Sequence, residues 1–131
     1  MIRFALFALL ALGLFQPASV QAQSLTEIRV QLQATLQRSL SRSMLEGALP
    51  HLDLTTGELT RFYPAENHEI ILRIADVYVM CATLVDADGT EATVDYYMTR
   101  SGGGYSLIRT EIHNRAPLLA LMESGKAIRL E

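Results

Sequence analysis

The fold is decided by residues 90–113, which read TEATVDYYMTRSGGGYSLIRTEIH. Apolar and polar side chains alternate on both sides of the three glycines, which is the period of two β-strands joined by a hairpin turn. In the first of these strands, Val94, Tyr96 and Met98 share one face, and Asp95 lies on the other. The stretch therefore predicts an antiparallel pair of β-strands with at least one buried face.

The segment before this hairpin predicts further strands. Residues 68–85 form the most apolar stretch outside the N-terminus. The stretch is too long for one ordinary strand, and we expect a kink or bulge near residues 75–76, where the apolar pattern is interrupted. An Asp-Gly pair at 88–89 is a strong turn signal and leads into the strand that follows. A shorter hairpin is expected over residues 52–63, with Pro64 ending it.

A long helix is predicted before these strands. Ser24 and Glu27 have the spacing of a capping box, and Gly47 and Pro50 supply stop signals, which gives a helix of about 22 residues. One apolar stripe runs along it, made of Leu25, Ile28, Leu32, Leu36, Leu40 and Met44. Pro117 is placed to begin a short C-terminal helix that ends near Gly125. Residues 23–131 thus predict a single α+β domain, with the long helix packed on an antiparallel meander.

The first residues resemble an export signal. Arg3 precedes an apolar run of twelve residues at 4–15, and Val20 and Ala22 are small residues at the spacing of a cleavage site. In a helix the run covers about 18 Å, which is short of the ~30 Å hydrocarbon core of a bilayer. We expect residues 1–22 to be a signal peptide that is cleaved after Ala22. The mature protein would then lie in the periplasm and would have no permanent membrane anchor.

Composition and residue spacing argue against several classes of function. The 131 residues carry a net charge of −3, so there is no basic excess to attract nucleic acid. His51, His68 and His113 lack the spacing of a local metal site, and no cofactor motif is present, so neither a metal nor a cofactor is predicted. The single cysteine, Cys81, is interpreted as a small buried hydrophobe, with an intermolecular disulfide or a reactive thiol as the alternative.

The best candidate for catalysis is one polar sheet face. Arg109, Glu111 and His113 are separated by single residues, so they would point the same way, and Asp95 would join them from the neighbouring strand. In a concave pocket these side chains could act as acid, base and cation. The preferred interpretation is a solvated outer face with cross-strand ion pairs.

The layout resembles the cystatin-like and NTF2-like superfamily of α+β proteins. The resemblance is carried by residues 94–112, VDYYMTRSGGGYSLIRTEI, which form a strand, a glycine turn and a partner strand after a long N-terminal helix. It implies a curved meander around the helix. No functional residue follows from it, because no motif is matched position by position.

Three functional hypotheses result. The first is a non-catalytic periplasmic module that binds a small apolar ligand between helix and sheet, or a protein partner on a sheet face or edge. Candidate ligand-binding residues are Ile70, Tyr96, Met98 and Leu107. The alternative is a small NTF2-like enzyme that uses His113 with Glu111 or Asp95. The third is a homodimer or assembly subunit docked through the apolar C-terminal helix.

Overall fold

The computed structural model describes residues 23–131, so the signal peptide expected at residues 1–22 lies outside the described residues. The chain forms an α+β domain, as predicted. Its elements in order are α1 (Leu25–Ser43), β1 (Leu49–Leu52), β2 (Leu59–Ile74), β3 (Val77–Val85), β4 (Glu91–Ser101), β5 (Gly104–Ile112), α2 (Ala116–Glu123) and β6 (Ala127–Arg129).

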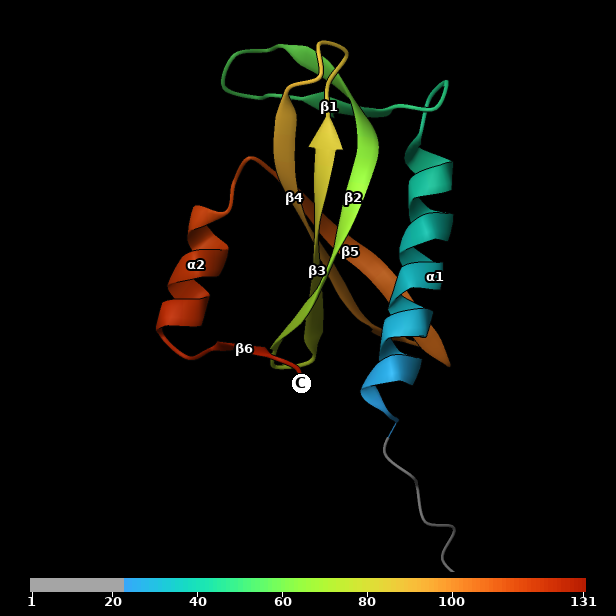
Figure 1. The fold of residues 1–131 in the computed structure, drawn as a ribbon, viewed down its shortest axis with the longest axis vertical. Helices are drawn as coiled ribbons and strands as arrows, with labels where there is room; N and C mark the ends of the chain where they lie inside the picture. Colours follow the sequence, from blue (N-terminus) through green and yellow to red (C-terminus); the bar gives the residue numbers. More distant parts are fainter. Residues whose placement is uncertain (1–22) are drawn as a thin grey trace, which may run out of the picture.

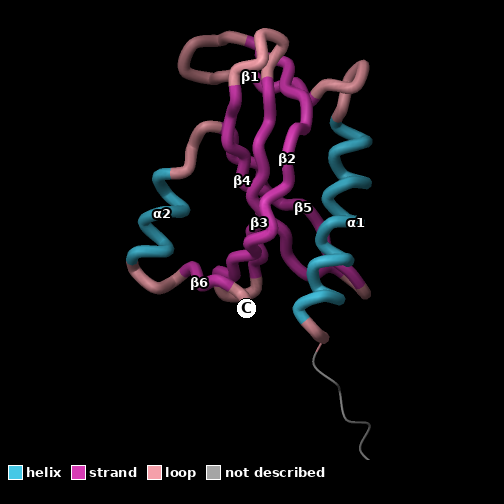
Figure 2. The backbone as a smooth tube through the Cα atoms, in the orientation of Figure 1, coloured by secondary structure: helices cyan, strands magenta, loops and turns pink. Residues whose placement is uncertain are grey.

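The strands form one antiparallel sheet in the order β1-β2-β3-β4-β5, which is the expected meander (Figure 1). β6 was not predicted from the sequence, and it pairs with residues 72–74 of β2. β1 pairs with residues 59–62 on the same edge of β2. The segment of β2 between these two short strands has no strand beside it on that edge among the described residues (Figure 2).

α1 covers one face of the sheet. Its predicted capping box is present, because the Glu27 N–H donates to the Ser24 hydroxyl (3.2 Å) and the Ser24 N–H donates to the Glu27 carboxylate (2.9 Å). The apolar stripe packs against the alternate residues of β3, β4 and β5, as the pattern predicted. The buried centre of this first core includes Leu32, Leu36, Met80, Val94, Tyr96, Met98 and Tyr105.

α2 covers the opposite face, so the sheet lies between two helices (Figure 1). Leu118 of α2 is fully buried and packs in a second, smaller core with Leu72, Val79 and Cys81. The expectation of a solvated outer face is therefore wrong where α2 lies. The sequence pattern could not show this, because β4 presents polar residues, including Asp95, at the positions that α2 covers.

Two expectations about β2 are also wrong. Pro64 lies inside the strand, because a register shift between Pro64 and Glu66 accommodates it, and proline is tolerated at bulges and edges. The apolar stretch at 68–85 is two strands, because Ala75 adopts a left-handed conformation (φ 49°) that reverses the chain at the position expected to be a kink. The register of the next hairpin, from β3 to β4, is regular along its length.

The first core supplies a stability test. Leu32→Ala should lower the free energy of unfolding by about 2–5 kcal/mol, because Leu32 is 0% exposed and its removal leaves a cavity. Val30→Ala, two residues earlier on α1 and 59% exposed, should change it by no more than about 0.5 kcal/mol. Urea unfolding followed by circular dichroism measures both, and equal effects would contradict this placement of α1.

Candidate functional site

An open groove of about 540 Å³ runs between α1 and β2. Its apolar lining comes from Leu36, Leu40, Met44, Pro64 and Met80, and its polar lining comes from Gln33, Gln37, Ser41 and Asn67. Leu36 and Met80 also belong to the buried core, so the bottom of the groove is continuous with it. None of these lining residues carries a charge. The groove therefore offers an apolar floor with neutral hydrogen-bonding groups.

The groove follows from two local features. On α1, Gln33, Gln37 and Ser41 are spaced four residues apart, so they form one row beside the apolar stripe. On β2, the register with β3 shifts twice, between Pro64 and Glu66 and between Asn67 and Ile71. Bulges of this kind bend a strand and redirect its side chains.

The predicted ligand-binding residues do not line this groove. Tyr96 and Met98 are buried in the first core, and Leu107 packs against its margin. Ile70 instead lines a smaller pocket on the α2 side of the sheet. The four candidates therefore do not share one cavity, because Ile70 alternates with Ile71 along β2 and faces the α2 side, whereas Ile71 enters the first core.

The polar candidates lie on the α2 face. The strand register places Asp95 of β4 between Cys81 of β3 and Glu111 of β5, and places Tyr97 opposite Arg109. Asp95 is only 1% exposed, and its Oδ1 lies 3.3 Å from the Arg115 guanidinium at the N-terminus of α2. A buried carboxylate requires such a compensating charge.

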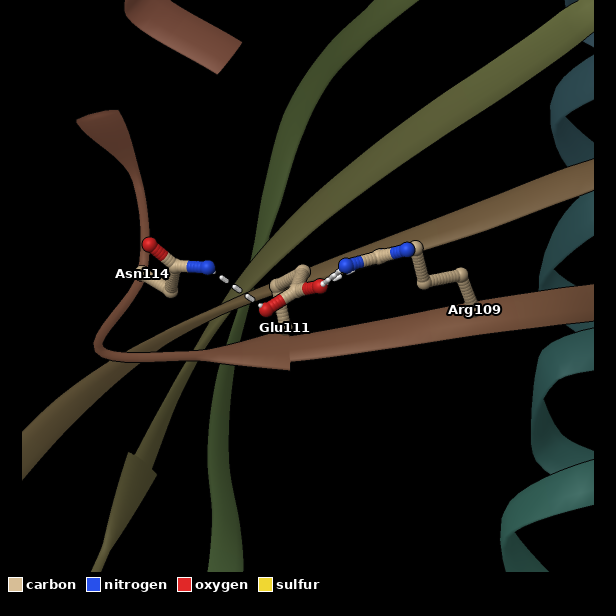
Figure 3. A network of polar contacts seen from close by, with 3 residues as sticks. All are labelled: Arg109, Glu111 and Asn114. Atoms are coloured by element: carbon tan, nitrogen blue, oxygen red, sulfur yellow. Dashed lines mark hydrogen bonds and ion pairs between the residues drawn. The ribbon is translucent and has the colours of Figure 1, made fainter. Parts of the chain in front are cut away.

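Glu111 is engaged by two neighbours at the margin that α2 leaves open. It forms an ion pair with Arg109 and accepts a hydrogen bond from Asn114 Nδ2 (2.9 Å), as Figure 3 shows. The hydrogen bond from Asn114 and the contact with Arg109 lower the pKa of Glu111 from its ordinary value of 4.5. Glu111 is thus held as a carboxylate.

His113 does not belong to this row. β5 ends at Ile112, and His113 turns the chain with a left-handed φ of 57°. The centroid of its imidazole lies 6.2 Å from the centroid of the Phe62 ring, and Phe62 belongs to the first core on the α1 face. The expectation that His113 points the same way as Arg109 and Glu111 is wrong, because the strand stops one residue too early.

Cys81 is buried beneath α2, as the preferred interpretation of the sequence expected. Burial, together with the neighbouring Asp95, raises the pKa of the Cys81 thiol to about 12. A thiol with such a pKa is a poor nucleophile at neutral pH.

Sequence reasoning missed the groove and Arg115. The row of Gln33, Gln37 and Ser41 beside an apolar stripe was a readable signal, since most exposed helix faces carry charges. Arg115 gave no local signal, because its role depends on where α2 docks. The sequence also did not show which apolar residues of α2 are buried: Leu118 is buried, whereas Met122 is half exposed.

Comparisons with known proteins found no matching family model, no similar curated protein and no similar solved structure. Within residues 23–131, no group of three His, Cys, Asp or Glu side chains is arranged to hold a metal ion. Over the same residues, no helix has the length and hydropathy needed to cross a bilayer.

The Asp95–Arg115 pair can be tested by removing the cation. Arg115→Met should lower the free energy of unfolding by about 3 kcal/mol, because it leaves the Asp95 carboxylate buried without a partner. Arg109→Met removes an arginine whose side chain is 67% exposed and should cost about 1 kcal/mol or less. Chemical unfolding at pH 7 measures the difference, and a smaller loss for Arg115→Met than for Arg109→Met would contradict the pairing.

Glu111 predicts a pH dependence. A carboxyl whose pKa is lowered in the folded state stabilises the protein above its ordinary pKa of 4.5, and this contribution disappears as the pH falls through the folded value. Glu111→Gln should therefore cost about 1 kcal/mol at pH 7, and the cost should shrink as the pH falls below 4.5 and through the lowered pKa of the folded state. Thermal unfolding from pH 7 to pH 2.5 measures this, with Glu91→Gln at an exposed position as the control. A cost that stays constant with pH would refute the assignment.

Proposed function

We propose that this protein is a non-catalytic binding module of the bacterial periplasm that holds a small uncharged amphiphile in the groove between α1 and β2. The observation that carries the proposal is the groove itself, with its volume of about 540 Å³. Small-molecule sites of proteins have volumes of roughly 300–1,000 Å³, apolar walls and a few placed polar groups. The export pattern of residues 1–22 supports the periplasmic location.

The lining argues for a neutral ligand. A fatty acid or a phospholipid headgroup brings a charge that a binding site normally compensates with Lys or Arg. The groove contributes only amides and a hydroxyl from Gln33, Gln37, Asn67 and Ser41, which can donate and accept hydrogen bonds without compensating a charge. Its floor of Leu36, Leu40 and Met80 suits an apolar chain or ring.

The enzyme alternative has no comparable observation behind it. It required His113 to meet Glu111 or Asp95 in a concave pocket. The structure places the His113 ring against Phe62, engages Glu111 with Arg109 and Asn114, and buries Asp95 with Arg115. A general base needs access to the proton that it removes, and these carboxylates are occupied by partners.

Binding can be tested with N-phenyl-1-naphthylamine, an uncharged apolar probe whose fluorescence rises on leaving water. Tag-free protein of residues 23–131, stripped with organic solvent, should bind it saturably at one site. Native mass spectrometry of the protein purified from the periplasm before stripping should show a ligand adduct that is lost on extraction.

A matched pair of variants locates the site. Ser41 and Ser43 are exposed serines in the last turn of α1, and each hydroxyl donates to the carbonyl four residues earlier. Only Ser41 lines the groove. Ser41→Trp should weaken probe binding at least about tenfold by filling the groove, a loss of roughly 1.4 kcal/mol. Ser43→Trp should bind the probe as the wild type does. Absence of saturable binding, or equal effects of the two variants, would overturn the proposal and favour a protein partner.

A further inference from the structure

We propose that a second pocket, between α2 and the sheet, binds a soft monovalent metal ion, Cu(I), through His68, Cys81 and Met122. The pocket has a volume of about 170 Å³ and lies on the opposite face of the sheet from the groove. Its lining consists of His68, Ile70, Leu72, Cys81, Arg115, Leu119 and Met122. Three of these seven side chains carry soft or borderline donor atoms.

The strands bring His68 and Cys81 together. Cys81 lies opposite the bulge of β2, because Asn67 pairs with Ala82 and Ile71 pairs with Met80. His68 Nε2 lies 3.0 Å from the hydroxyl of Thr83, which points to the same face of β3 as Cys81. The hydrogen bond to Thr83 orients the imidazole and leaves Nδ1 for a ligand, an arrangement that commonly supports metal-binding histidines.

α2 supplies the third donor. Met122 is 42% exposed, yet its side chain lines the same pocket as Cys81 and His68. Thiolate, thioether and imidazole together form a set that favours Cu(I) over the harder divalent ions. Because one of its three members is a methionine, the set differs from a cluster of His, Cys, Asp and Glu side chains, the kind that residues 23–131 lack.

The charges of the pocket suit a monovalent cation. Arg115 lines the pocket, but its charge is compensated by the buried Asp95 at 3.3 Å. When the metal binds, a metal–sulfur bond forms, the S–H bond of Cys81 breaks, and the proton leaves to solvent. Cu(I) thus replaces H⁺ on the sulfur, and the net charge beneath α2 does not change. A divalent ion would leave one uncompensated positive charge there.

The test uses tag-free protein of residues 23–131, an anaerobic Cu(I) titration against a chromogenic Cu(I) chelator, and Ag(I) as a redox-inert probe. Native mass spectrometry should show one metal ion gained and one proton lost. Cys81→Ala should abolish this binding, and His68→Gln and Met122→Leu should each weaken it at least tenfold.

The chain offers matched controls for His68→Gln and for Met122→Leu. His51→Gln and Met44→Leu replace the same residue types away from the pocket and should change the affinity less than twofold. Binding that survives Cys81→Ala, equal effects of the pocket and control variants, or a preference for Zn(II) over Cu(I) would overturn the proposal. Probe binding in the α1 groove should be unchanged in Cys81→Ala, so this proposal and the proposed function can fail separately.

Discussion

Burial of Asp95 beneath α2 is the constraint on which the outer half of the molecule depends. β4 is a central strand covered on both faces, so its alternate residues must satisfy two different environments. Val94, Tyr96 and Met98 enter the apolar core under α1, whereas Asp95 places a carboxylate under α2. Where α2 covers this carboxylate, Arg115 supplies the opposite charge. The contact between α2 and the sheet thus combines a charge pair, Asp95 with Arg115, and the apolar packing of Leu118.

The bulge of β2 between Asn67 and Ile71 connects the two candidate sites. In a regular strand, neighbouring side chains alternate between faces. The side chains of this segment keep that alternation, because Asn67 lines the groove under α1, whereas His68 and Ile70 line the pocket under α2. The register shift leaves Cys81 opposite unpaired backbone of β2, where its side chain can take part in the smaller pocket. One short segment of β2 thus contributes to both surfaces.

Sequence reasoning succeeded where the determinants are local. The capping box of Ser24 and Glu27 depends on two residues three positions apart. The apolar stripe of α1 and the alternation in β4 and β5 are each contained within a single helix or strand. It failed where distant segments decide. Asp95 looked solvent-facing because α2, which covers it, begins only at Ala116. Pro64 looked like a strand end because the register shift that accommodates it is set by the pairing with β3. His113 continues the alternation of β5 in the sequence, but β5 ends at Ile112 and His113 adopts a left-handed conformation, so the alternation does not apply to it.

The bare edge of β2 between β1 and β6 bears on solubility. An uncovered strand edge is a template for pairing with other chains, and aggregation follows when it is long and flat. Pro64 lacks the N–H that a new strand would need, the two register shifts break the flat ladder, and the Arg29 side chain donates to the Glu69 carbonyl (3.1 Å). An edge with these features is a poor template for pairing with another chain. Regularising β2 to stabilise the sheet would therefore restore a flat edge on which other chains can pair.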